Sequence, residues 1–198
     1  MKKIIVATRN KGKVSEFKKI MDGYDVITQA EAGIDVEVIE TGATFEENAL
    51  IKARAISLLS GEDVIADDSG LEVFCLDGRP GIYSARYGGE DADDSKKMEL
   101  LNKEIDESGS DNRDARFVSV IALVKADGSE HTFRGECAGS IIRTPKGDGG
   151  FGYDPIFYVE EYDQTFAQMP ADLKNKISHR AMALEKLKEY FEEKTEMK

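Results

Sequence analysis

The arrangement of apolar and polar residues along the chain predicts a sheet with three buried strands. Apolar runs fill Lys3–Ala7, Val64–Ala66 and Phe117–Val124, and each is followed by polar sequence. Such runs are typical of strands that are covered on both faces. Weaker strand signals occur at Tyr24–Ile27, at Ile34–Glu40 with partial alternation, at Leu71–Leu76, and at His131–Arg134 and Gly135–Ile142 after the Asp127–Gly128 turn.

Four other segments repeat their apolar residues every three or four positions, which is typical of amphipathic helices. The second of them begins with a capping box, Thr44-Phe-Glu-Glu47, whose side chains satisfy the free N–H groups at a helix start. The fourth has Ser178 as its predicted N-cap. The predicted buried faces are Val14, Phe17, Ile20 and Met21; Phe45, Ala49, Ala53 and Ile56; Met98, Leu101 and Ile105; and Ala181, Leu184, Leu187 and Phe191.

Composition and charge limit the fold and the partners. The 198 residues, 40% of them hydrophobic, are enough for one substantial core, or for one core with an added lobe. The formal net charge of -12 argues against sequence-independent nucleic-acid binding and against docking on anionic lipid, because both need a basic face. An anionic ligand would therefore require a local concentration of cations or a divalent metal.

The cysteines and the apolar runs bear on the compartment. Cys75 and Cys137 lie in separate segments without a CxxC motif, so neither a zinc site nor a disulfide framework is predicted. No apolar run reaches the roughly 18 residues of a membrane span, and the apolar start of the chain is too short for a signal peptide. We therefore expect a soluble protein of the cytosol.

The stretch Val64-Ile-Ala-Asp-Asp-Ser-Gly70 carries the strongest signal for chemistry. It places two adjacent carboxylates at the expected exposed end of a buried strand. Carboxylates are costly to desolvate unless a cation meets them, which predicts a metal or catalytic site. Neighbouring strand side chains point to opposite faces, so only one of Asp67 and Asp68 is expected to face the reaction centre. The alternative is a strand-to-turn junction in which Asp and Ser side chains cap a turn.

Cations occur at two predicted helix N-termini, where the helix dipole disfavours them. Arg9, Lys11 and Lys13 surround the start of the first helix, and His179 and Arg180 lie in the first turn of the last one. A phosphate bound to free backbone N–H groups would remove the first conflict. Solvated surface lysines are the alternative for the first group, and pairing with nearby acids is the alternative for the second.

Two loops have the composition of ligand contacts. Four glycines fall between Gly147 and Gly152, and Phe151 lies among them. Glycine permits close approach of the backbone to a planar or phosphorylated ligand, and Phe151 is available for stacking. A flexible surface loop is the alternative. The segment Ile82–Gly89, rich in Tyr, Arg and Gly, is typical of either a ligand contact or a subunit interface.

Six blocks of sequence together resemble one family. They span nearly the whole chain and are Ala7-Thr-Arg-Asn-Lys-Gly-Lys13, Glu40-Thr-Gly-Ala-Thr-Phe-Glu-Glu-Asn-Ala49, Ala66-Asp-Asp-Ser-Gly-Leu71, Pro80-Gly-Ile-Tyr-Ser-Ala-Arg86, Gly149-Gly-Phe-Gly-Tyr-Asp-Pro155 and Ile177-Ser-His-Arg180. In order and spacing they resemble the inosine triphosphate pyrophosphatase family, which hydrolyses non-standard purine nucleoside triphosphates.

This resemblance implies a fold and a reaction. The implied fold is α/β, with a long mixed central sheet flanked by helices and two lobes that enclose an active-site cleft. Residues 1–198 would form a single nucleoside triphosphate pyrophosphatase domain, and the usual assembly would be a homodimer. The implied reaction is Mg²⁺-dependent hydrolysis of ITP, dITP or XTP to the monophosphate and pyrophosphate, which would remove deaminated purines from the nucleotide pool.

The same resemblance implies roles for particular residues. Asp68 is the expected general base that activates water, and Glu40 and Asp68 are the expected Mg²⁺ ligands. Asp67 would support orientation or the outer shell of the metal. Lys52 resembles a further phosphate contact.

The implied nucleotide site combines phosphate and base contacts. Residues 8–13 would bind the triphosphate, Phe151 would stack on the base, and His179 and Arg180 would address the 6-oxo edge of the purine. The full implied substrate-binding set is Thr8, Arg9, Asn10, Lys11, Gly12, Lys13, Ser69, Phe151, Gly152, Tyr153, Asp154, Lys174, His179 and Arg180.

Two other functions compete with this interpretation. A related pyrophosphatase that acts on other altered nucleotides, such as modified pyrimidines, would differ in its base selectivity. A nucleotide-binding regulatory protein would keep the pocket without turnover. Such a regulator would not need the carboxylates of Asp68 and Glu40, and both are present.

Overall fold

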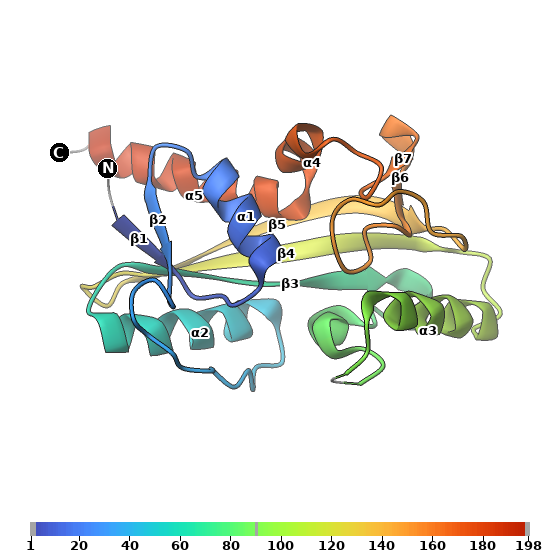
Figure 1. Cartoon of the computed structure of the whole chain (residues 1–198), viewed down its shortest axis with the longest axis horizontal. Coiled ribbons are helices and arrows are strands. Elements are labelled where there is room, and N and C mark those ends of the chain that lie inside the picture. Colours follow the sequence, from blue (N-terminus) through green and yellow to red (C-terminus); the bar gives the residue numbers. More distant parts are fainter. Residues whose placement is uncertain (1–2, 90, 197–198) are drawn as a thin grey trace. The chain divides into compact units, whose positions relative to one another are not determined.

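The structure, a computed structural model, describes residues 3–89 and 91–196 (Figure 1). Helices and strands alternate along much of the chain. In order they are β1 (Lys3–Val6), α1 (Lys11–Ile20), β2 (Asp25–Thr28), α2 (Phe45–Ser60), β3 (Val64–Val73), η1 (Phe74–Leu76), η2 (Gly81–Arg86), α3 (Asp94–Glu107), β4 (Asp114–Val124), β5 (Glu130–Ile141), β6 (Phe157–Val159), η3 (Glu160–Tyr162), β7 (Gln164–Thr165), α4 (Ala171–Ile177) and α5 (His179–Glu196).

The strands form a seven-stranded sheet in the order β2-β1-β3-β4-β5-β6-β7. β1 pairs in parallel with both β2 and β3, and Ile5 lies opposite Val64 in the second pair. β6 pairs antiparallel with β5 and with β7. The predicted mixed central sheet flanked by helices is therefore confirmed, whereas the cleft between two lobes stays a prediction.

The chain folds into two compact units, and β3, β4 and β5 contribute to both. Unit 1 comprises Met1–Asp68, Ser119–Gly135 and His179–Lys198. Within it, α2 lies on one face of the strands and α1 and α5 lie on the other (Figure 1). The core of unit 1 is a cluster of buried side chains from β1, β3, β4, α1 and α5 that includes Ile4, Phe17, Ile65, Ile121 and Leu184.

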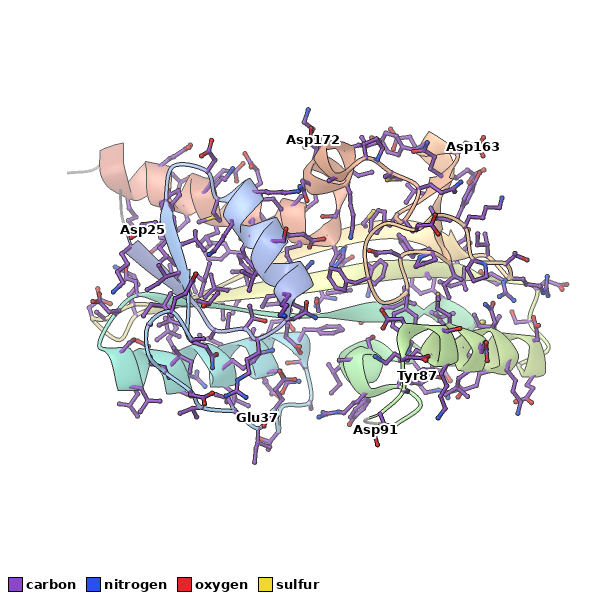
Figure 2. The ribbon with its side chains drawn as sticks, in the orientation of Figure 1. Asp25, Glu37, Tyr87, Asp91, Asp163 and Asp172 are labelled. Carbon is purple, nitrogen blue, oxygen red and sulfur yellow. The ribbon has the colours of Figure 1, made fainter. Side chains whose placement is uncertain are left out.

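Unit 2 comprises Ser69–Val118 and Glu136–Ser178 and has its own core. This core includes Leu71, Leu101, Ile105, Phe157 and Phe166, all less than 2% exposed. Tyr87, labelled in Figure 2, lies before α3 and donates a hydrogen bond of 2.6 Å to Glu104 Oε2. That contact ties the segment before α3 to the helix itself. None of the described helices is long and apolar enough to span a membrane.

The predicted capping and burial patterns are present in the helices. Thr44 Oγ1 accepts the N–H of Glu47 at 3.1 Å, and Glu47 Oε2 accepts the N–H of Ala43 at 2.6 Å, so the capping box is present at the start of α2. Gly61, at a φ of 69°, ends this helix in the left-handed conformation that glycine adopts easily. The predicted buried positions of α2, α3 and α5 are all buried.

Two strand expectations need correction. β3 does not end at the carboxylate pair but continues to Val73, because Leu71 and Val73 extend the alternating buried face. The strand-to-turn alternative for this stretch is therefore wrong. Residues 34–40 form no strand, and Val36 and Ile39 are 40% and 77% exposed, so the alternation there has no core to pack on. Gly135–Ile142 continues the preceding strand, giving the single β5.

Candidate active site

The centre of the candidate site in unit 1 is Asp67, whose side chain is fully buried in β3. Its Oδ2 lies 2.6 Å from Lys13 Nζ and 3.1 Å from Arg180 Nη2. Its Oδ1 accepts a hydrogen bond of 2.5 Å from Ser119 Oγ on β4. Burial alone would raise the pKa of Asp67, but the charges of Arg180 and Lys13 outweigh it and hold that pKa well below its usual range. Asp67 is therefore a fixed negative charge.

Arg180, in the first turn of α5, is matched by acids. Its side chain is 1% exposed, and its guanidinium pairs with Glu16 of α1 as well as with Asp67. The helix start reaches this position because Gly135 of β5 has no side chain. A Cβ there would lie 2.1 Å from the carbonyl oxygen of His179. Pairing with nearby acids, the alternative offered for this cation, is what the structure shows for Arg180.

Lys52 of α2 joins the two predicted metal ligands. Its Nζ lies 2.5 Å from Glu40 Oε1 and 3.4 Å from Asp68 Oδ1, and it donates a hydrogen bond of 2.9 Å to the carbonyl oxygen of Asp67. The Asp68 side chain is 7% exposed. The two adjacent carboxylates thus have different cationic partners at closest range, as expected for neighbours on a strand.

The second carboxylate oxygen of Asp68 has no partner among the described residues. This oxygen, Oδ2, is buried and makes no hydrogen bond to any described residue. Burial raises the pKa of Asp68, and the opposing effect of the Lys52 and Lys13 charges does not cancel that rise. A carboxylate with an uncommitted oxygen and a raised pKa is a suitable acceptor for a proton from water.

The donor set fits one kind of metal site and not another. Among the described residues, no group of three or more His, Cys, Asp or Glu side chains is arranged to hold a metal ion. A Mg²⁺ ion that binds together with a nucleotide needs only one or two carboxylates, because phosphate oxygens and water complete its shell. Glu40 and Asp68 supply two carboxylates that meet at Lys52, and Asp68 Oδ2 is uncommitted. These residues fit a nucleotide-bound Mg²⁺ rather than a cage made by protein alone.

The predicted phosphate-binding segment is divided between the surface and the interior. Asn10 is the N-cap of α1, and Thr8 Oγ1 accepts the N–H of Asn10 at 3.2 Å. Arg9 pairs with Asp35 at 2.5 Å, with side chains 51% and 95% exposed, and Lys11 is also exposed. Lys13 alone of these cations reaches Asp67. Burial lowers the pKa of Lys13, an effect that Asp67 partly offsets.

Unit 2 holds the predicted base-binding loop in a defined conformation. Phe151 N–H donates to Asp154 Oδ2 at 2.9 Å, and Gly152 N–H donates to Asp94 Oδ2 at 2.7 Å. Gly150 has a φ of 72°, and a Cβ on it would lie 2.0 Å from Asp154 Oδ2. Only glycine fits there, so the glycines shape this loop.

Lys174 of α4 completes the arrangement around Phe151. It is 8% exposed at its side chain and pairs with Asp154 Oδ2 at 2.7 Å. Its ammonium group lies 5.1 Å from the centre of the Phe151 ring and 5.6 Å from that of Phe166. A cation over an aromatic face is attractive, more so when both groups are desolvated. Phe151 is thus supported by a buried charge while remaining partly exposed.

Tyr153 connects this loop to η2. Its hydroxyl donates to the carbonyl oxygen of Ser84 at 2.9 Å, and Ser84 Oγ accepts the N–H of Leu71 on β3 at 2.9 Å. Ser84 Oγ also donates to the carbonyl oxygen of Gly81 at 2.6 Å. Ser69, the first residue of unit 2, is partly exposed.

The structure joins several of the predicted residues into one cluster within each unit. Unit 1 links Lys13, Lys52, Glu40, Asp67, Asp68 and Arg180. Unit 2 links Phe151, Asp154 and Lys174, and Gly152 bonds to Asp94. Arg9 pairs with Asp35 instead, and Lys11 is exposed. Three supporting residues, Glu16, Asp94 and Ser119, were not predicted. A signal existed for Ser119, a hydroxyl within an apolar run, and for Glu16, an acid beside the buried face of α1.

Comparison with known proteins gives a consistent result. The sequence model of the Ham1 family matches residues 4–190 of the chain. A dITP/XTP pyrophosphatase of Bacillus licheniformis is 49% identical over 189 residues, which are 94% of this chain and 96% of that protein.

Two solved structures share the fold over nearly the full length of the chain. The Ham1 protein of Staphylococcus aureus superposes with a TM-score of 0.88 at 44% identity, covering 98% of this chain and 100% of that one. A HAM1 protein of Coxiella burnetii gives a TM-score of 0.90 at 38% identity, with the same coverage of 98% and 100%.

Proposed function

The chain belongs to the Ham1 family, and on that premise we propose that it hydrolyses non-standard purine nucleoside triphosphates to the monophosphate and pyrophosphate. ITP, dITP and XTP are the proposed substrates, and Mg²⁺ is the proposed cofactor. Family membership confirms the resemblance that the motifs indicated. The name of the Bacillus licheniformis relative supports the same substrates. Removal of deaminated purines from the nucleotide pool is the proposed biological role.

One observation carries the catalytic part of this proposal. Asp68 Oδ2 is buried and uncommitted, while the other oxygen of this carboxylate lies 3.4 Å from a lysine that also pairs with Glu40. A regulatory protein that only bound nucleotide would have no use for a buried carboxylate prepared in this way, because an unsatisfied buried acceptor is destabilising. Asp68 is therefore the proposed general base.

The residues of unit 1 have separate roles in the proposed mechanism. Asp68 accepts a proton from the attacking water, and Glu40 and Asp68 would hold the Mg²⁺ ion. When bound, Mg²⁺ offsets the negative charge of the phosphates and of the leaving pyrophosphate. Lys13 and Lys52 contribute positive charge to the triphosphate from positions fixed by their ion pairs. Thr8, Arg9, Asn10, Lys11 and Gly12 are the proposed further phosphate contacts, through backbone N–H groups at the start of α1 and the exposed cations.

Base recognition is assigned to the loop in unit 2 and to the start of α5. Phe151 is the proposed stacking residue, supported by Lys174, with Ser69, Gly152, Tyr153 and Asp154 completing the substrate contacts. His179 and Arg180 are the proposed donors to the 6-oxo group. Because Glu16 and Asp67 already engage the guanidinium of Arg180, a base contact would have to use N–H groups outside these two pairs.

The proposed donors give a physical reason for base selectivity. Hypoxanthine and xanthine carry an acceptor oxygen at C6, whereas adenine carries a donor amine there. A fixed N–H donor facing the amine of adenine is left without an acceptor, and an unmatched buried donor costs about 1–3 kcal/mol.

Two further properties are proposed with the activity. The protein would act in the cytoplasm and would assemble as a homodimer, with residues 83–87 contributing to the interface. Tyr83 is 56% exposed, which leaves it accessible for such a contact. Sedimentation of wild type and Tyr83→Ala tests the second point, and an unchanged dimer in the variant would remove residue 83 from the interface.

The experiment that tests the function is pyrophosphate release from ITP, XTP, dITP, GTP, ATP and dUTP, with and without Mg²⁺. Wild type should prefer ITP, dITP and XTP and should require the metal. Asp68→Asn should lower kcat on the order of 10²–10⁴-fold, as expected for loss of a general base. A preference for dUTP would favour the pyrimidine-acting alternative. Binding of ITP without Mg²⁺-dependent release would favour the regulatory one.

A further inference from the structure

The proposed metal ligand Glu40 lies in a segment with little structure of its own. Residues 34–43 form neither helix nor strand, and Ile39, next to Glu40, is 77% exposed. Near the start of this segment, the carbonyl oxygen of Val36 accepts a hydrogen bond of 2.8 Å from Gln29 Nε2. A carboxylate on such a segment needs local contacts to hold it, because a metal ligand must stay within a narrow range of geometry.

Those contacts come from the first two turns of α2. Asn48 Oδ1 accepts the N–H of Gly42 at 2.8 Å, two residues after Glu40. Asn48 and Lys52 are four positions apart, so they lie on the same face of the helix. Asn48 holds the backbone beside Glu40, and Lys52 Nζ holds its carboxylate at 2.5 Å. Two neighbouring side chains of one helix thus hold both the backbone beside Glu40 and the Glu40 carboxylate.

The approach of the segment to the helix is close. A Cβ on Gly42 would lie 2.6 Å from Glu47 Cβ and 2.7 Å from Asn48 Oδ1. Real Cβ contacts are not this short, so any side chain at position 42 would push the turn away from α2. Because no left-handed φ is involved at this glycine, the requirement for glycine here comes from contact alone.

Asn48 is also a polar residue at a buried position, where an apolar side chain would be expected. The residue is fully buried, and its Nδ2 makes no hydrogen bond to any described residue. Its Oδ1 must face Gly42, because a backbone N–H needs an acceptor, so the orientation of the amide is determined. A buried donor without a partner in the protein is costly, so an asparagine at this position needs a reason beyond filling space.

We propose that Asn48 is a positioning residue for the metal ligand Glu40. It holds the turn at Gly42 so that the Glu40 carboxylate stays beside Lys52 and Asp68. This inference rests on the proposed function, since it assigns a role within the same metal site. It predicts that loosening the turn weakens metal binding while leaving the catalytic carboxylate in place.

The test uses two variants that disturb the same contact from opposite sides. Asn48→Leu removes the acceptor with little change in shape, and Gly42→Ala inserts the Cβ that the turn cannot hold. In each, the Mg²⁺ concentration for half-maximal pyrophosphate release from ITP should rise about tenfold, which is the usual effect of losing an outer support of a metal ligand. The kcat at saturating Mg²⁺ should stay within about twofold of wild type. The double variant should be little worse than either single variant.

Metal binding without turnover supplies the second readout. Mn²⁺ takes the same oxygen ligands as Mg²⁺. Its binding to the protein is measured from the loss of the free-ion EPR signal beyond the loss that the nucleotide alone causes. The protein is mixed with an ITP analogue whose α,β-bridging oxygen is replaced by methylene. Both variants should bind Mn²⁺ about tenfold more weakly than wild type.

Ser57→Ala is the matched control. Ser57 is a buried polar residue of the same helix, and its Oγ donates to the carbonyl oxygen of Glu62 at 3.0 Å, at the other end of α2. This variant should keep the wild-type metal requirement. Wild-type Mn²⁺ binding in Gly42→Ala, or an equal weakening in Ser57→Ala, would overturn the inference. Failure of the proposed function looks different, because wild type would then bind Mn²⁺ and the analogue but release no pyrophosphate from ITP.

Discussion

The two units of the protein differ in which ionisable groups they take out of water. In unit 1, the buried charges of Asp67, Arg180 and Glu16 are arranged in ion pairs, and Asp67 also pairs with the partly buried Lys13. In unit 2, three neutral acids are shielded from water: Tyr153 is buried, and Tyr87 and Cys137 are half-buried. Burial, with a hydrogen bond to Glu104, raises the pKa of Tyr87; burial also raises the pKa of Tyr153, and that of Cys137 to about 11. Unit 2 also contains the buried ion pair of Lys174 and Asp154.

The difference separates two kinds of recognition. Buried ion pairs give little net stability, because the loss of hydration offsets much of their attraction. Several of them lie around one strand in unit 1, and they are therefore better explained by a need for fixed charges. The proposed triphosphate and its metal ion would create that need. Unit 2 offers an aromatic ring, a shaped glycine loop and one supporting cation. Such a surface suits a flat and mostly neutral group such as a purine base.

The largest expected effect comes from Asp67→Asn. The substitution keeps the shape of the side chain but leaves Lys13 and Arg180 without their shared carboxylate. Removing one partner of a buried ion pair typically costs 3–5 kcal/mol, so we expect a loss of about that size. Urea unfolding followed by circular dichroism gives the measurement.

Asp68→Asn is the neighbouring control. Its charge is already disfavoured by burial, since the pKa of Asp68 is raised in the folded protein. Neutralising it should change the free energy of unfolding by less than about 1 kcal/mol while removing activity. If the two substitutions destabilised the protein equally, the distinction between a structural and a catalytic carboxylate would be lost.

Local patterns predicted local structure well, as α2 illustrates. The capping box located its start, and four positions at helical spacing identified its buried face, because both signals lie within one segment. The elements that escaped prediction are short. β7 has two residues and α4 has seven, so neither contains enough residues to establish a period. Lys174 was named only through the family resemblance, since nothing in its own segment marked it.

The contacts between residues of the candidate site were harder to predict than the residues themselves. Glu16 and Arg180 are separated by 164 positions, and Ser119 and Asp67 by 52. No local pattern encodes such pairs, because they depend on which elements the sheet places side by side. The sequence placed cations at two helix starts but did not show which acids pair with them. The fold brings those acids close.

In unit 2, Lys174→Met tests whether the buried cation supports the proposed base-binding loop. Asp154 would lose its ion pair but keep the N–H of Phe151, so we expect a loss of about 3 kcal/mol, at the low end for a broken buried pair. KM for ITP should rise more than kcat falls, because the cation under Phe151 is lost.

The double variant Lys174→Met with Asp154→Asn separates stability from binding. Asparagine keeps an acceptor for Phe151 N–H and removes the unpaired charge, so most of the lost stability should return. KM should stay high. A kcat defect that outweighed the KM defect in both variants would contradict a role confined to the base.

Tyr153→Phe is expected to have a smaller effect. The buried hydroxyl donates to the carbonyl oxygen of Ser84, and removing it should cost about 1 kcal/mol at neutral pH. The pKa of Tyr153 is raised, so the folded state holds this proton more tightly than the unfolded state. That contribution is complete below the ordinary tyrosine pKa of about 10 and is lost as the pH rises above it.

The stability difference between wild type and Tyr153→Phe should therefore narrow above about pH 10, because only wild type can ionise at this position. Unfolding in urea at pH 8 and at higher pH measures the change. A constant difference would mean that the phenol does not contribute to the alkaline loss of stability.

The smallest expected effect is that of Arg9→Ala, which serves as the surface counterpart of the buried cations in unit 1. Arg9 and Asp35 are 51% and 95% exposed at their side chains, and exposed ion pairs contribute roughly 0–1 kcal/mol because water and salt screen them. The free energy of unfolding should change by less than about 0.5 kcal/mol. KM for ITP should still rise severalfold at low salt if Arg9 contacts the triphosphate, and this rise should shrink as salt is added. A salt-independent KM would place Arg9 outside the phosphate site and leave Lys13 and Lys52 as the cations that act there.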